Sequence, residues 1–477
     1  MQPLKWLDDN DARLIGDLSK LVAVQSISTD GAHQKEIEQS AAVTCELMRN
    51  ARLQNVTMLK TGNSNPYAYG EWLGAPGKPT VFLYAHHDVQ PINYVQDWES
   101  DPWTLTARDG RLYGRGSADD KGAIVTQLGA IASYLHTKGS LPVNVKMLVE
   151  GEEEVGSSNL QGFFVEHKDR IRSDVIVVCD TGNVDVGQPC ITYSLRGIVE
   201  VIVEVQCATK PVHSGTAGGM LADAALALNV ILARLYWGHK KLPIPGFAEK
   251  IRKLTPAERG AFRKLLPAEE KLRKDNGVLD GVELALESKV NAHEATWRKP
   301  SITIIAQEAS SIQGRSNQVL PTARAVVSCR IVPDQEPEEV FEQIKAVLTK
   351  DPPWGVKVNI KPGGAVKWWM TDPTGPAFNA AIKALRRGFG VKPVPIGCGG
   401  SIGFVGPLAE LFDGAPALLL GIEDPLSNAH APNESLHAGD FRKLTKSLTY
   451  LFEELGNLPD GKVKADPTAT PAEQPAA

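Results

Sequence analysis

The acidic run Glu150-Gly151-Glu152-Glu153-Glu154 follows directly after an apolar, strand-like segment, residues 145–149. Carboxylates packed this closely repel one another unless a protonated carboxyl, a basic side chain or a metal ion lies among them. A metal ion at this place would need further ligands from other parts of the chain.

Such ligands follow other apolar segments. They lie directly after segments 81–84 and 175–178, in the glycine-punctuated loop 114–122 and in loop 428–434, and they are His86, Asp180, Asp119 and His430. Apolar strands that alternate with helices, such as the one expected over 123–132, indicate a parallel sheet covered on both faces. Because ligands of such sheets bind beyond the carboxyl ends of the strands, these side chains are expected to lie close together.

With Glu154, the candidates comprise two histidines and three carboxylates. Nitrogen ligands mixed with oxygen ligands suit zinc, manganese or cobalt better than calcium, which prefers oxygen alone. Five ligands are too few for two separate closed sites. They suffice for a dinuclear site if one carboxylate bridges, and open positions then remain for water and substrate.

Each residue also has an ordinary explanation when it is taken alone. His86 could be a core histidine, the acidic run could begin a solvated helix, and Asp180 could cap one. Arg330, in an alternating strand, could face solvent. The recurrence of ligand types at successive strand ends favours the metal site.

Composition excludes several classes of function. The 477 residues carry a net charge of −5 without a Lys/Arg-rich run, so neither a nucleic-acid partner nor a membrane surface is expected. No apolar run approaches the length of a transmembrane helix. The six cysteines form no C-x-x-C pair, which favours a reducing, cytoplasmic location.

The chain is long enough for more than one domain. The pattern predicts an α/β domain with a mainly parallel sheet over residues 1–196 and 369–460, interrupted by a smaller α+β domain over 197–368. Within the smaller domain, residues 255–298 are charged and helix-prone and are interpreted as an insertion. The Ala/Pro/Thr-rich tail, 461–477, is expected to be disordered.

Three segments resemble the M20 family of dinuclear metallopeptidases, and particularly its cytosolic dipeptidase branch with the carnosinase-like enzymes. They are Tyr84-Ala85-His86-His87-Asp88-Val89, Gly114-Arg115-Gly116-Ser117-Ala118-Asp119-Asp120-Lys121-Gly122 and Glu150-Gly151-Glu152-Glu153-Glu154-Val155-Gly156-Ser157. The resemblance covers nearly the whole chain except the tail. It implies a zinc-peptidase-type catalytic domain interrupted by a lid that mediates homodimerisation.

The resemblance also implies a division of labour at the metal site. One ion would be held by His86, Asp119 and Asp180, and the other by Asp119, Glu154 and His430. Asp88 would orient His86, because side chains two residues apart in an extended strand point the same way. Glu153 would be the general base, and the peptide bond between Asp119 and Asp120 would be cis.

Further residues are implied outside the metal ligands. His213 would reach the active site of the partner subunit and stabilise the oxyanion, and Arg330 with the Gly400-Ser401 loop would bind the substrate carboxylate. Cys398 stands where carnosinase-like enzymes usually have a glutamate that contacts the free amine of the substrate.

The expected activity is hydrolysis of the peptide bond of dipeptides, or of similar small substrates with a free carboxylate, by two divalent ions, zinc in the first place and manganese or cobalt otherwise. The nearest alternatives are an N-acyl-amino-acid deacylase, which the cysteine at 398 leaves open, and a carboxypeptidase. A rival of another class is a non-catalytic metal-binding protein on this fold. It would have no reason to retain Glu153 and Asp88.

Overall fold

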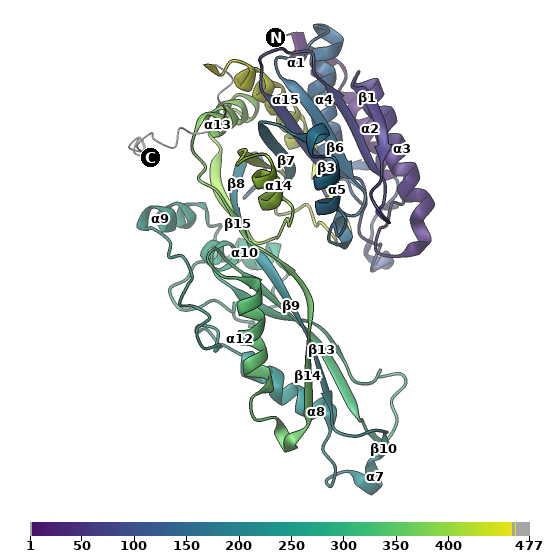
Figure 1. Ribbon diagram of the computed structural model, residues 1–477, viewed down its shortest axis with the longest axis vertical. Helices are drawn as coiled ribbons and strands as arrows, with labels where there is room; N and C mark the ends of the chain where they lie inside the picture. Colours follow the sequence, from purple (N-terminus) through teal and green to yellow (C-terminus); the bar gives the residue numbers. More distant parts are fainter. Residues whose placement is uncertain (1, 460–462, 464–477) are drawn as a thin grey trace. The chain divides into compact units, whose positions relative to one another are not determined.

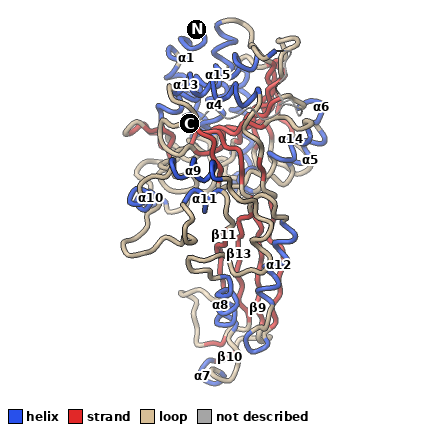
Figure 2. The backbone as a smooth tube through the Cα atoms, turned by 90° about the vertical axis from the view of Figure 1, so that its left-hand side faces the viewer, coloured by secondary structure: helices blue, strands red, loops and turns tan. Residues whose placement is uncertain are grey.

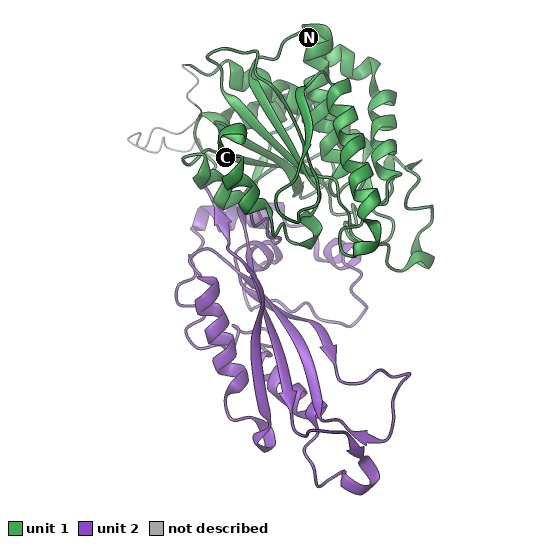
Figure 3. Cartoon of the chain, turned by 45° about the vertical axis from the view of Figure 1, so that its right-hand side comes forward, with its two compact units in different colours: residues 1–193, 372–396, 404–477 green, residues 194–371, 397–403 purple. Residues whose placement is uncertain are grey.

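The computed structural model describes residues 2–459 and 463 and divides into two compact units (Figure 3). Unit 1 comprises residues 1–193, 372–396 and 404–477, and unit 2 comprises 194–371 and 397–403. The expectation of disorder over 461–477 falls outside the described residues, apart from residue 463. The assignment of a catalytic domain to 1–196 and 369–460 and of a lid to 197–368 stays a prediction.

The main sheet of unit 1 has the strand order β1-β2-β6-β3-β7-β17-β8-β15, with β16 paired to β8. Strands β6, β3, β7 and β17 run parallel to one another. The pairs β1–β2, β2–β6, β17–β8 and β15–β8 are antiparallel. The strands are β1 Gln54–Leu59, β2 Tyr67–Trp72, β3 Thr80–His86, β6 Asn144–Glu150, β7 Val175–Gly182, β8 Cys190–Leu195, β15 Trp369–Met370, β16 Val394–Cys398 and β17 Ala417–Glu423. This mainly parallel centre confirms the predicted α/β class.

Helices cover both faces of this sheet. Successive side chains of β3 point to opposite faces and are apolar and buried on both. Val81 and Leu83 point into a core shared with the N-terminal helices, α4, α13 and α15, whereas Phe82 and Tyr84 pack against Phe412 and Phe404 on the other face. The helices of unit 1 are α1 Gln2–Asp9, α2 Asp11–Val22, α3 Gln34–Asn50, α4 Lys121–Thr137, α5 Leu160–Glu166, α6 Lys168–Ile171, α13 Pro376–Phe389, α14 Val405–Leu411 and α15 Ala438–Gly456 (Figure 1). A small sheet adds β4 Thr106–Arg108, β5 Arg111–Tyr113 and β18 Ser435–His437.

Unit 2 is built on an antiparallel sheet of order β11-β13-β9-β14. Strand β9 buries every second residue, and its valines share one core with α8 and α12. Figure 2 shows these two helices beside the strands of unit 2. The strands are β9 Gly197–Gln206, β11 Ser301–Glu308, β13 Thr322–Ile331 and β14 Lys357–Val366, and a separate pair consists of β10 Val212–His213 and β12 Gln318–Val319.

The predicted insertion in unit 2 contains three short helices joined by loops. The helices of this unit are α7 Ser214–Ala217, α8 Ala224–Leu232, α9 Pro256–Leu265, α10 Glu269–Asp275, α11 Ala292–Trp297 and α12 Pro337–Thr349. Phe262 of α9 meets Trp297 of α11 edge to face, with ring centroids 5.0 Å apart, and this contact holds the two ends of the insertion together.

In the described part of the chain, no helix is both long enough and apolar enough to cross a membrane.

Candidate metal centre

Parallel strands bring the predicted ligands of unit 1 to one edge of the sheet. Strand β3 ends at His86, which lies opposite Glu150 at the end of β6, and the neighbouring strand β7 carries Asp180 near its end. Directly after Glu150 the chain forms a short turn, Glu153–Val155, that presents the acidic run at the same edge. Helix α4 begins just after Asp119, and the peptide bond between Asp119 and Asp120 is cis, as the family resemblance implied.

Two groups of potential ligands share one residue. His86, Asp119 and Asp180 form one group, and Asp119, Glu154 and His430 form the other. Within each group the ligand atoms lie within 4.8 Å of one another. The structure thus brings together all five predicted ligands, with Asp119 between the two groups.

The shared carboxylate lies between two imidazoles. His86 Nε2 is 3.0 Å from Asp119 Oδ1, and His430 Nε2 is 2.9 Å from Asp119 Oδ2 and 3.2 Å from Glu154 Oε2. His86 is fully buried, whereas the His430 side chain is 56% exposed. One side of the centre is therefore accessible to solvent and to a substrate.

The electrostatics of these groups fit divalent cations. Burial, together with the nearby charges of Asp120 and Asp119, raises the pKa of Asp180 well above its ordinary value. Hydrogen bonds to Asp119 and Glu154 raise the pKa of His430 to about 10. Buried carboxylates that crowd in this way lack compensating positive charge. Mixed imidazole and carboxylate donors are the set that transition-metal ions prefer, so the residues present fit a two-ion centre.

Asp88 connects the histidine ligand to the acidic turn. Its Oδ1 lies 3.5 Å from His86 Nδ1 and accepts a hydrogen bond from the backbone N–H of Glu153 at 3.2 Å. Its Oδ2 accepts from the backbone N–H of Glu154 at 3.1 Å and from Ser28 Oγ at 2.6 Å. A single buried carboxylate thus fixes both the imidazole and the turn that carries the proposed base.

Glu153 and Glu154 differ in their surroundings although they are neighbours. Gln90 Nε2 donates to Glu154 Oε2 at 2.8 Å, which holds this carboxylate toward His430. Burial, together with the charges of Glu154 and Asp119, raises the pKa of Glu153 to about 7. A carboxyl group that changes its protonation near neutral pH is suited to general acid–base catalysis.

The other two glutamates of the acidic run have structural partners. Glu150 accepts a hydrogen bond from Tyr84, and Glu152 accepts from Tyr67 Oη at 3.1 Å and from the backbone N–H groups of Asn65 and Asn159. Glu152 therefore fixes the loops beside the acidic turn.

Glu434 is a positioning residue to which the sequence alone assigned no role. Its buried carboxylate accepts hydrogen bonds from the backbone N–H groups of Gly116, Ala118 and Asp119 at 3.0–3.1 Å, and it pairs with Arg115 at 2.7 Å. The glycine-rich loop that presents Asp119 is thus held by a residue more than 300 positions away in the chain. The only sequence feature that could have indicated this role is the position of Glu434 in the polar loop that contains His430.

The residues predicted to bind a carboxylate lie in unit 2. Arg330 Nη1 donates to Ser401 Oγ at 2.8 Å, and the backbone N–H of Gly400 lies 3.3 Å from Cys398 Sγ. No carboxylate pairs with Arg330 among the described residues, so its guanidinium retains donors for an anionic ligand.

Arg196 fixes the position of this loop. The sequence alone did not predict this role. This buried side chain donates to the carbonyl oxygens of Gly399 at 3.0 Å and Lys299 at 3.2 Å and to Ser301 Oγ at 3.2 Å. Burial and the neighbouring charge of Arg330 lower its pKa to about 10. Two adjacent guanidinium groups make this part of unit 2 a positively charged site.

His213 lies at the opposite end of the unit 2 sheet from Arg330. His213 pairs with Gln318 in the small β10–β12 sheet. Strand β12 lies just before Thr322, the first residue of β13, whereas Arg330 lies near the other end of β13 (Figure 1). At about 3.4 Å per residue, β13 separates Thr322 from Arg330 by about 27 Å. His213 and Arg330 of one chain therefore do not contact a common small substrate.

Comparisons with known proteins agree with this arrangement. Residues 82–454 match the model of peptidase family M20/M25/M40. The chain is 32% identical to the cysteinylglycine-S-conjugate dipeptidase of Corynebacterium striatum, over 90% of this chain and 92% of that protein. It is 28% identical to the Beta-Ala-His dipeptidase of Rattus norvegicus, over 96% of each.

A solved structure shows the same fold. Human carnosine dipeptidase 1 superimposes with a TM-score of 0.85 at 26% identity, over 96% of this chain and 98% of that one. The family match covers most of the chain and includes every candidate metal ligand. The chain therefore belongs to peptidase family M20/M25/M40, the family that its three motifs resemble.

Proposed function

We propose that this chain is a dipeptidase that uses two divalent metal ions to hydrolyse the peptide bond of small substrates with a free C-terminal carboxylate. Zinc is the first candidate for these ions. The observation that carries the proposal is the pair of ligand groups that share Asp119, with Glu153 beside them. The relatives named as dipeptidases, which match nearly the whole chain, support the substrate class.

The proposed ligands of the first ion are His86, Asp119 and Asp180, and those of the second are Asp119, Glu154 and His430. When bound, the two ions would polarise the scissile carbonyl and acidify the attacking water. Glu153 takes the proton from that water and passes it to the leaving amine, while Asp88 keeps His86 and the Glu153 turn in place.

The substrate carboxylate is assigned to Arg330, Ser401 and the backbone of Gly400. A planar guanidinium that already donates to Ser401 is suited to bind a carboxylate by two parallel hydrogen bonds. Arg196 supports this assignment, because it fixes the backbone on which Gly400 and Ser401 lie.

A homodimer is part of the proposal. Its support is the separation of His213 from Arg330, since His213 can stabilise an oxyanion only in a site whose Arg330 belongs to another chain. Strand β11 supplies a surface for such contact, because it is an edge strand with exposed Ile304 and Ile305, and unpaired edges readily join a second chain. We also propose a cytoplasmic location, which the buried thiols of Cys45, Cys179 and Cys329 support.

The test is a hydrolysis screen of unblocked dipeptides against N-acyl amino acids, run separately with zinc, manganese and cobalt. The expected result is preferential cleavage of dipeptides. Cleavage of blocked substrates alone would contradict the dipeptidase assignment and favour the deacylase alternative. The observation that supports this alternative is Cys398, whose Sγ lies beside the backbone N–H of Gly400. Absence of all turnover in the metal-loaded protein would favour a non-catalytic role.

A further inference from the structure

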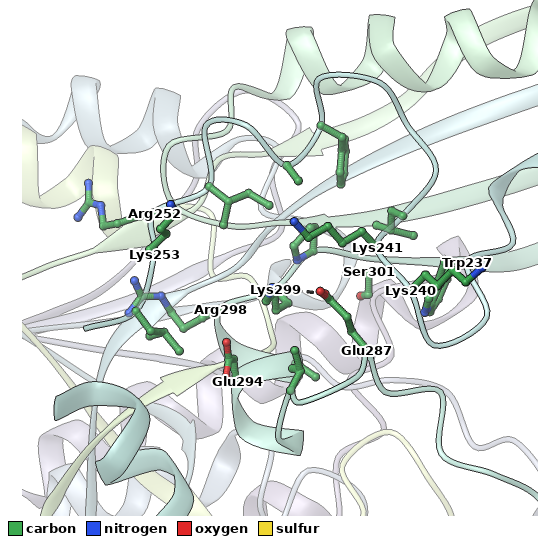
Figure 4. A pocket seen from close by; sticks show the side chains of 18 of the residues that line it. Trp237, Lys240, Lys241, Arg252, Lys253, Glu287, Glu294, Arg298, Lys299 and Ser301 are labelled. Carbon is green, nitrogen blue, oxygen red and sulfur yellow. Dashed lines mark hydrogen bonds and ion pairs between the residues drawn. The ribbon is translucent and has the colours of Figure 1, made fainter. Parts of the chain in front are cut away.

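Unit 2 contains a cavity that none of the proposed catalytic or carboxylate-binding residues lines. It has a volume of about 320 Å³ and lies between segment 237–259 and segment 285–301 (Figure 4). Seven of the 21 residues that line it belong to the charged insertion over 255–298. The catalytic roles assigned above leave this insertion without a function.

Basic side chains dominate the lining of this cavity. Seven basic residues face three acidic ones: Lys240, Lys241, Arg252, Lys253, Arg259, Arg298 and Lys299 against Glu249, Glu287 and Glu294. The lining is therefore cationic before any pairing is considered.

Ion pairs neutralise part of this charge but leave a surplus. The pairs are Arg252 with Asp334, Arg259 with Glu294, Arg298 with Glu258 and Lys299 with Glu287, at 2.7–3.3 Å. Among the described residues, no ion pair joins Lys240, Lys241 or Lys253 to a carboxylate, and of the acidic lining residues only Glu249 is left. The surplus is two positive charges.

The rest of the wall is apolar. Trp237, Leu242, Phe247, Ile251 and Leu254 line the cavity together with the charged groups. In Figure 4, Lys241 extends across the cavity, whereas Lys240 lies at its edge beside Trp237. Exposed lysines are usually only solvated, but these lysines line a partly open cavity together with apolar side chains, and such a mixed lining is typical of a small-molecule site.

We propose that this cavity binds a small organic dianion that carries an aromatic or aliphatic body. The two surplus charges match a phosphomonoester or a dicarboxylate, and the apolar wall takes up the body of the ligand. The volume lies near the lower end for small-molecule pockets, which begin at about 300 Å³, so the expected ligand is small.

The experiment is isothermal titration of the full-length, metal-loaded protein with AMP, with adenosine and with isophthalate. AMP supplies a dianion on an aromatic body, adenosine supplies the body without the charge, and isophthalate supplies two carboxylates. The expected result is binding of AMP, of isophthalate or of both, and affinity for adenosine at least about tenfold weaker than for the dianion that binds. Preference for AMP or for isophthalate identifies the charged group that the cavity accepts.

Three variants locate the binding. Lys241→Glu should weaken dianion binding by about tenfold or more, Lys241→Arg should retain it, and Lys361→Glu, at an exposed lysine on β14 away from the cavity, should leave it unchanged. Quenching of Trp237 fluorescence, absent in Trp237→Phe, provides a second readout.

The proposal is overturned if neither dianion binds, if adenosine binds as well as the dianion that binds, or if Lys241→Glu binds that dianion like the parent protein. The last result would assign the dianion to the metal centre or to the site of Arg330 and Arg196, neither of which Lys241 lines. Because binding is measured without turnover, failure here leaves the proposed dipeptidase activity untouched.

Discussion

At the scale of single residues, the division of the acidic run is the main feature of the site. Glu154 lies against His430, Glu153 has a pKa raised to about 7, and Glu152 is bound to backbone N–H groups of neighbouring loops. Three adjacent carboxylates with different partners therefore have three different proposed uses.

Glu153→Gln tests the proposed base. The variant keeps the size of the side chain but cannot accept the proton, so kcat should fall by about a hundredfold to ten-thousandfold, the usual contribution of a general base. Metal content should stay unchanged, because Glu153 belongs to neither ligand group.

The matched control is Glu152→Gln. It should lower the stability, since Glu152 accepts several buried hydrogen bonds, but turnover per folded molecule should stay close to that of the parent. If Glu153→Gln retained full activity, Glu153 would have no part in the mechanism.

At the scale of elements, the sequence predicted the strands better than the contacts that fix the loops. Apolar segments 81–84 and 175–178 marked β3 and β7, because strands covered on both faces carry continuous apolar runs. The predicted helix 123–132 is the centre of α4, whose ends extend to Lys121 and Thr137.

The predicted ligands come together because each lies at or beyond the carboxyl end of a strand, which is a local signal. The roles of Glu434 and Arg196 could not be predicted in this way. Arg196 contacts Gly399 across 203 positions, and Glu434 contacts Gly116 across 318, so only the assembled fold brings these partners together.

Arg196→Lys tests the support of the carboxylate loop. Lysine cannot reproduce three hydrogen bonds from one planar group, so the backbone at Gly399 should shift and KM should rise more than kcat falls. The free energy of unfolding should drop by about 1–3 kcal/mol, because buried acceptors lose their donor.

The control for this variant is Arg324→Lys, at an exposed arginine of the same unit that pairs with Glu308. It should change neither KM nor stability measurably. Equal kinetics of Arg196→Lys and the parent protein would show that the loop holds its position without this arginine.

A half-buried histidine predicts a pH effect on the stability of the insertion. His293 stacks on Trp297 with ring centroids 4.0 Å apart, and burial lowers its pKa below the ordinary value of 6.5. A depressed pKa means that its contribution to stability is present above pH 6.5 and is lost as the pH falls through the lowered value.

The Tm of the parent protein should therefore fall more steeply between pH 7 and pH 5 than the Tm of His293→Gln. Thermal unfolding followed by circular dichroism at a series of pH values measures both. Parallel curves for the two proteins would contradict the assignment of this effect to His293.

At the scale of the whole molecule, the chain carries its proposed functional groups in two units. The metal ligands and Glu153 are in unit 1, and the carboxylate-binding residues and His213 are in unit 2. Because β13 separates His213 from Arg330 within unit 2, the proposed action of both residues on one substrate requires a second chain.

Mixing two inactive variants tests this requirement. In a heterodimer of His213→Ala and Arg330→Ala chains, one site should contain both residues intact. Random reassociation should therefore restore about a quarter of the parent activity. The measurement is turnover before and after mixed refolding, with each variant refolded alone as the control. No recovery, with heterodimers verified by mass spectrometry, would contradict the cross-subunit role.

Metal content per chain, measured after zinc loading and dialysis, shows whether Asp119 bridges a two-ion centre. We expect two ions in the parent protein, about one in Asp180→Ala and in His430→Ala, since each loses a ligand of one ion only, and fewer still in Asp119→Ala. A single ion in the parent protein, or two ions retained in Asp119→Ala, would contradict the bridged two-ion centre.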